Sequence, residues 1–100
     1  MPRTVSLDGY VIETLMRDLI SHDRKPSAFA VYLWLWLRTH GEARRSVHQS
    51  LQQLADGTGL SKSAVQSAVK ALLRRHLLSA RQASRTATPE YMVNRPWAER

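Results

Sequence analysis

The sequence predicts a small, mainly α-helical α+β domain with about four helices and one β-hairpin. Two observations lead to this class. Apolar residues recur at helical spacing through most of the chain, and two short segments near its end alternate apolar and polar residues. The 100 residues can bury one core, and the sequence has no repeat or obvious linker, so we predict a single domain over residues 1–100.

The first helix is predicted from about Leu7 to Ser21, within an amino-terminal element of residues 1–24. Its apolar residues recur in pairs every four positions, which places them along one stripe. Glu13 and Arg17 are spaced as a favourable pair on the opposite side. Pro26 disfavours a helical residue before it and is well placed to open the next helix.

The second helix is predicted from about Ser27 to Thr39, ending at Gly41. It is apolar nearly all round, so it must be buried on more than one side. Trp34 and Trp36 lie roughly 200° apart on this helix. An aromatic cage for a ligand is an alternative, although aromatic residues at this spacing more often belong to a core or an interface.

The surplus of apolar surface on these two helices predicts a homodimer, because one small core is unlikely to bury all of it. In the alternative interpretation, the amino-terminal helix folds back over its own domain and completes a monomeric core. The predicted interface consists of Val11, Ile12, Leu15, Met16, Leu19, Ile20, Trp34 and Trp36.

Two short helices are predicted next, after a possible short strand at Ser46-Val47-His48. Ser50 and Gln53 have the form of a capping box, so the third helix is expected to begin there and to end at Asp56 or Gly57. Ser61 is expected to cap the fourth helix. That helix has two faces: Val65, Ala68, Val69 and Leu72 lie on one side, and Ser63, Gln66, Ser67, Lys70 and Arg74 lie on the other.

The last elements are two predicted strands. Leu78 and Ala80 alternate with polar neighbours, as do Tyr91 and Val93, and the loop from Gln82 to Pro89 between them carries Arg85 at its expected tip. His76 precedes the first strand, and we expect it to leave the helix through a left-handed turn.

The order of Ala55, Gly59 and Val65, with apolar Leu54 and Leu60 beside them, resembles the DNA-binding helix-turn-helix family. The basic loop between two strands looks like the wing of the winged-helix branch, and the resemblance covers about residues 27–97. In the related pattern a glycine often stands where this chain has His76. The resemblance implies a winged helix-turn-helix domain of the kind found in prokaryotic transcriptional regulators.

The polar face of the fourth helix is suited to the major groove, since an apolar back fixes the helix while short serines allow close approach. Gln66 can pair with adenine, Lys62 or Lys70 can reach guanine or phosphate, and the wing can follow the backbone or the minor groove. A solvated polar face and an ordinary flexible loop are the alternatives. The predicted DNA-binding residues are Ser61, Lys62, Ser63, Gln66, Ser67, Lys70, Arg74, Arg81 and Arg85.

The net charge of +7 is concentrated in the second half of the chain. Residues 51–100 hold eight Lys/Arg against three Asp/Glu, whereas residues 1–50 hold seven against five. A pI near 10.8 favours a nucleic-acid partner, although a membrane surface, an acidic protein partner or solubility alone could also explain it.

Catalytic and metal-binding classes find little support. The chain has no cysteine, its four histidines are scattered without ligand spacing, and no catalytic motif is present. The longest apolar run, Ala28 to Leu37, is too short to span a bilayer. We therefore expect a cytoplasmic, nucleoid-associated protein that is not an enzyme, with no metal, no cofactor, no small-molecule ligand and no membrane contact.

The predicted function is sequence-specific binding of double-stranded DNA by a small transcriptional regulator. A replication, partition or phage-type protein that uses the same domain on DNA is one alternative, and a winged-helix protein-interaction module is another.

Overall fold

The computed structural model describes residues 3–98. The amino-terminal helix runs over residues 9–22 and contains two π-helical segments, η1 (Val11–Leu15) and η2 (Asp18–His22). It begins two residues later than predicted, and the sequence analysis did not predict its π-helical segments. A π turn contains more residues than an α turn, so a helix that combines the two has about four residues per turn. Residues spaced by four therefore lie on the same side, and Val11, Leu15 and Leu19 are all buried there.

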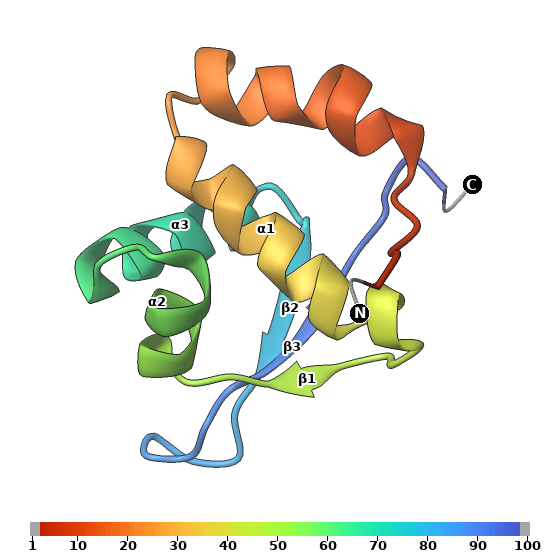
Figure 1. Cartoon of the computed structure of the whole chain (residues 1–100). Helices are drawn as coiled ribbons and strands as arrows, with labels where there is room; N and C mark the ends of the chain where they lie inside the picture. The colour runs from red at the N-terminus through yellow and green to blue at the C-terminus, as the bar shows by residue number, and fades with distance from the viewer. Residues whose placement is uncertain (1–2, 99–100) are drawn as a thin grey trace.

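Helix α1 (Pro26–Arg38) is the central element, and Figure 1 shows it crossing the middle of the molecule. Pro26 occupies the start of the helix, where its missing N–H would have no partner in any case. At the other end the Thr39 hydroxyl donates to the Leu35 carbonyl at 2.7 Å, and the short 3₁₀ turn η3 (His40–Glu42) follows. The predicted helix is confirmed to within one residue at each end.

Helices α2 (Leu51–Thr58) and α3 (Lys62–Arg74) are joined by a tight turn at Gly59, whose φ of 81° lies in the left-handed region that favours glycine. The predicted capping box is confirmed: the Ser50 hydroxyl accepts from the Gln53 N–H, and the Gln53 side chain accepts from the Ser50 N–H. Ser61 caps α3 by accepting from the Ala64 N–H at 3.1 Å.

The sheet has three antiparallel strands in the order β1-β3-β2: β1 (Val47–His48), β2 (Leu78–Arg81) and β3 (Glu90–Val93). The predicted hairpin of β2 and β3 is confirmed, and β1 adds to its free edge, with Val47 opposite Tyr91. Tyr91 and Val93 point into the core while Met92 between them is exposed, as their alternation predicts. His76 has the expected left-handed φ of 59°.

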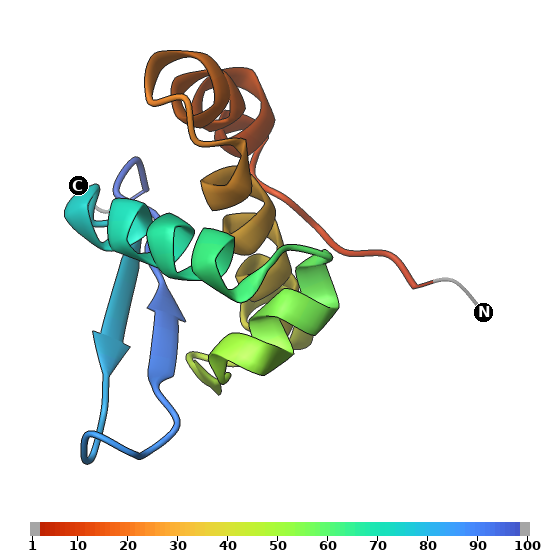
Figure 2. The same ribbon diagram turned by 90° about the vertical axis from the view of Figure 1, so that its left-hand side faces the viewer.

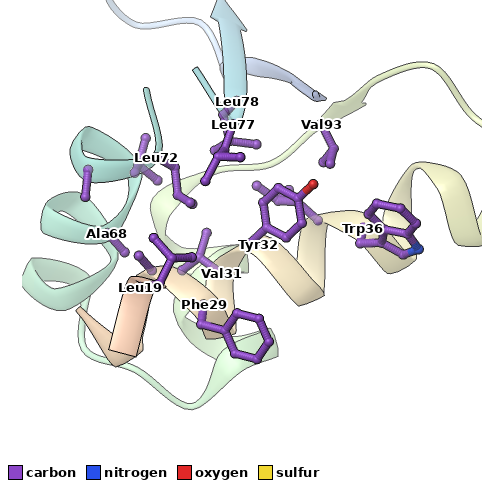
Figure 3. Close-up of a cluster of buried hydrophobic side chains, with 14 of the residues drawn as sticks. Leu19, Phe29, Val31, Tyr32, Trp36, Ala68, Leu72, Leu77, Leu78 and Val93 are labelled. Carbon is purple, nitrogen blue, oxygen red and sulfur yellow. The ribbon is translucent and has the colours of Figure 1, made fainter. Parts of the chain in front are cut away.

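One hydrophobic core lies between α1, α3, the sheet and the amino-terminal helix. Figure 3 shows Leu19 gathered with Val31 of α1 and Ala68 of α3 in this cluster. The Tyr32 hydroxyl donates to the Asn94 carbonyl at 2.9 Å, which ties α1 to the end of β3. All these residues belong to one chain, so the amino-terminal helix completes the core of its own domain.

This packing corrects the predicted dimer interface. Val11, Leu15, Leu19 and Trp36 are at most 3 % exposed, because residues of the same chain already cover them. These four side chains therefore offer no exposed surface to a second subunit. For them, the alternative interpretation, in which the amino-terminal helix folds back over its own domain, is correct. The apolar stripe was visible in the sequence, but which surface covers it depends on the path of the chain after His22.

The resulting architecture is the predicted mainly α, α+β winged helix-turn-helix. Helices α2 and α3 form the helix-turn-helix, and the loop between β2 and β3 projects as a wing at the lower left of Figure 1. Helix α3 and the wing loop lie on the same side of the molecule, which faces the viewer in Figure 2.

Candidate nucleic-acid interface

Helix α3 presents a polar face to solvent and an apolar face to the core. Val65, Ala68, Val69 and Leu72 are buried, as predicted. Because they fix the helix against α1, the orientation of its outer face is determined by the core. The predicted residues that are exposed on the outer side are Ser61, Lys62, Ser63, Gln66, Lys70 and Arg74.

The basic charge of this region has little acidic charge to balance it. Residues 57–89, which include α3 and the wing, contain six Lys/Arg and no Asp or Glu. Four of the six, Lys62, Lys70, Arg74 and Arg85, form no ion pair with any carboxylate of residues 3–98. A surface with several unpaired cations attracts a polyanion.

Ser67 is less available than the sequence predicts. Its side chain is half-buried, and its hydroxyl oxygen accepts a hydrogen bond from the Lys25 ammonium, which lies at the start of α1. The Ser67 hydroxyl therefore holds the Lys25 side chain in place and is less free to contact DNA. The sequence analysis missed Lys25, because the two residues are 42 positions apart and no periodicity links them.

Arg81 is also engaged within the chain. Its Nε and Nη2 atoms both donate to one oxygen of Glu90 on β3, at 3.2 and 2.8 Å, and the Ser46 hydroxyl donates to the other oxygen at 2.6 Å. The hydrogen bond from Ser46, followed by those from Arg81, lowers the pKa of Glu90, so its carboxyl group is ionised at neutral pH. Arg81 was predicted to contact a DNA phosphate. In the structure its charge is balanced by Glu90.

The wing has a defined conformation at its tip. The Ala87 N–H donates to the Ser84 carbonyl, which closes a turn with Arg85 and Thr86 at its centre. The Gln82 side-chain amide donates to the Ala87 carbonyl at 2.6 Å and supports the turn from inside the loop. Arg85 is exposed at the tip, where the sequence places it.

Between the wing and the start of α2 lies an open cavity of about 610 Å³. It is lined on one side by Ala83, Ala87 and Thr88 of the wing and on the other by His48 and Gln53, with Arg81 and Glu90 at its base. The wing is thus separated from α2 by an open hollow.

Trp34, which was assigned to the dimer interface, has its contacts within the chain. Its indole N–H donates to the Gln49 side chain at 3.1 Å, and the Arg38 guanidinium lies 4.5 Å from its ring centroid. Gly57 of α2 packs against the same ring so closely that a Cβ atom there would lie 2.4 Å from it. Trp34 therefore joins α1 to α2. Of the other predicted interface residues, Met16 is half-buried, and Ile12 and Ile20 are 45 % and 41 % exposed.

Neither a metal site nor a membrane-spanning helix is found in the part of the chain that the structure describes. Within residues 3–98, no group of three or more His, Cys, Asp or Glu side chains is arranged to hold a metal ion. Over the same residues no helix has both the length and the apolar character needed to cross a bilayer. In comparisons with protein-family models, with curated proteins and with solved structures, nothing matches this chain.

Proposed function

We propose that this protein binds double-stranded DNA in a sequence-specific manner and acts as a small regulator of transcription, in the cytoplasm at the nucleoid. The observation that carries the proposal is the exposed basic and polar face of α3, in a 33-residue segment without any carboxylate, residues 57–89. A helix enters the major groove when its back is fixed to a domain and its front offers hydrogen-bonding side chains.

The exposed residues take different roles in this proposal. Gln66 lies in the middle of the outer face of α3 and has the amide group that pairs with adenine. Lys62 and Lys70 are within reach of guanine or phosphate from the same face. Arg74 and Arg85 contact phosphates, because an arginine near a helix end or at a wing tip meets the backbone on either side of the groove.

The Arg85 position supports the assignment of the hairpin as a wing. The turn at the tip is braced by Gln82, so Arg85 is held at the far end of the loop with no carboxylate partner in residues 3–98. An arginine on a short hairpin can reach the sugar-phosphate backbone or the minor groove beside a recognition helix.

The proposed assembly on DNA is a homodimer. The core of one chain leaves Ile12 and Ile20 of the amino-terminal helix 45 % and 41 % exposed, and their spacing of eight residues places them on the same side of the helix. A second copy of the same helix could cover these side chains. Two subunits would present two α3 helices to half-sites about 34 to 36 Å apart on one face of the duplex.

Selection of bound sites from random duplexes tests the proposal directly. A recognition helix should enrich one short motif, and a dimer should enrich it in two-fold symmetric form. The log of affinity should fall with log salt at a slope of about −0.9 for each phosphate contacted, hence about −3.6 for each bound subunit if Lys62, Lys70, Arg74 and Arg85 each contact one. Absence of any enriched motif together with equal displacement by polyglutamate would contradict it and favour an acidic protein partner.

A further inference from the structure

The turn between the amino-terminal helix and α1 is fixed onto the side of α3 at two points. Asp23 accepts two hydrogen bonds from the Arg75 guanidinium, at 2.6 and 2.9 Å, and Lys25 donates to Ser67. Arg24 between them has a left-handed φ of 54°, a conformation that non-glycine residues rarely adopt. This local conformation is retained because both of its neighbours reach the same helix.

A hollow of about 300 Å³ lies between this turn and α3, lined by Asp23, Lys25, Ala71, Arg74 and Arg75. It holds three cations and one anion. The charges of Asp23 and Arg75 offset each other, since the guanidinium and the carboxylate meet through two hydrogen bonds. Lys25 and Arg74 have no carboxylate partner among residues 3–98, so the hollow has a net positive charge.

We propose that Lys25 and Arg74 bind one backbone phosphate of the DNA duplex in this hollow. The inference rests on the proposed function and adds a contact outside the helix-turn-helix and the wing. Its location supports a duplex phosphate, because Arg74 also belongs to the exposed face of α3. A helix in the major groove has the sugar-phosphate backbone along its flank, and Arg74 of α3 is also one of the residues that line the hollow.

The arrangement also explains why Lys25 is held in place. A lysine on a free turn would lose considerable side-chain entropy on meeting a phosphate, and the hydrogen bond to Ser67 restricts it beforehand. The Asp23–Arg75 pair fixes the backbone of the turn beside it. The pair therefore acts as a support, and Lys25 and Arg74 supply the charge for the phosphate.

The test is Lys25→Gln, which removes the charge and keeps a side chain that can donate to Ser67. Binding of a duplex that carries the selected motif and of a random duplex is measured over a range of salt. We expect affinity for both duplexes to fall several-fold and the salt slope to become shallower by less than about 0.9 per subunit, because Arg74 still contacts the same phosphate. Lys25→Arg should restore both values.

Arg17→Gln is the matched control, because Arg17 is exposed on the amino-terminal helix and its replacement changes the net charge by the same amount. It should leave the salt slope unchanged. Thermal unfolding of each variant verifies that the fold is intact. The double variant Lys25→Gln/Arg74→Gln should lose less affinity than the sum of the single losses, because both residues bind the same phosphate.

The outcomes separate this inference from the proposed function. If the wild-type protein binds no duplex, both are overturned. If it binds and Lys25→Gln behaves like Arg17→Gln, only the phosphate site is overturned. A third arm uses inorganic phosphate: if millimolar phosphate stabilises the wild type but not Lys25→Gln, while duplex binding is equal in the two, the hollow holds a free anion and the duplex contact is wrong.

Discussion

Glu90 and Arg81 lie opposite each other on β3 and β2, and the guanidinium donates two hydrogen bonds to one carboxylate oxygen, at 2.8 and 3.2 Å. Glu90 lines the hollow beside the wing, so its negative charge lies next to the proposed DNA surface. It also balances one of the few cations on the hairpin.

Replacing Glu90 by Gln should strengthen DNA binding. The substitution removes the negative charge and leaves Arg81 free to meet a phosphate, so we expect a several-fold higher affinity and a salt slope steeper by about 0.9 for each bound subunit. Glu13→Gln on the amino-terminal helix changes the net charge equally and serves as the control. Equal effects of the two substitutions in a salt titration would show that Glu90 does not restrain Arg81.

Gln66→Ala should weaken the reading of sequence more than the binding of DNA in general. Loss of the amide contact is expected to cost about 1 to 3 kcal/mol on the selected motif and to relax preference at one or two base pairs. Competition between selected and random duplexes measures the difference. The same loss on both duplexes would mean that Gln66 reads no base.

The Asp23–Arg75 pair should make folding stability depend on acid pH. Hydrogen bonds from Arg75, and secondarily the contact with His22, lower the pKa of Asp23 from 3.8 to about 2. The pair therefore stabilises the fold fully above the unfolded pKa of 3.8, and this contribution is lost as pH falls through about 2. Asp23→Asn should cost about 1 kcal/mol at neutral pH, the size expected for a partly exposed ion pair.

Urea unfolding of the wild type and of Asp23→Asn across this pH range provides the measurement. The two proteins should differ at pH 6 and converge toward pH 2. A constant difference over the whole range would mean that the substitution acts through packing and that the charge of Asp23 contributes nothing.

Gly57→Ala should destabilise the protein although alanine favours helices. The new Cβ atom would lie 2.4 Å from the Trp34 ring, and the ring is held by Gln49 and Arg38, so we expect a loss of about 1 to 3 kcal/mol in urea unfolding. In a Trp34→Leu background the same substitution should cost less. An equal loss of unfolding free energy in both backgrounds would show that the destabilisation does not come from the contact with the Trp34 ring.

The proposed homodimer should depend on Ile12 and Ile20, which are exposed in the single chain. Sedimentation equilibrium of the wild type at micromolar concentration should give about twice the 11.4 kDa of one chain. Ile12→Glu and Ile20→Glu should shift the protein to monomers and leave thermal unfolding of the domain nearly unchanged, since neither side chain is in the core. A wild-type species near 11.4 kDa would show that the domain acts alone.

Local patterns in the sequence were sufficient for most of the elements. The capping box of Ser50 and Gln53, the cap at Ser61 and the alternation of Tyr91 and Val93 each depend on residues within four positions of one another. Interactions over such short distances along the chain follow from backbone geometry alone. The exposed face of α3 was predictable for the same reason, because helical periodicity separates it from the buried face.

Only the tertiary structure decided which partner each surface meets. The stripe of Val11, Leu15 and Leu19 had to be buried, but periodicity cannot distinguish a cover from the same chain from a cover by a second subunit. Likewise, the sequence shows that Arg81 and Lys25 are basic, whereas their pairing with Glu90 and Ser67 depends on the register of two strands and on the path of the turn at Arg24. Contacts between distant residues are fixed by packing of the whole core, and no short-range pattern carries that information.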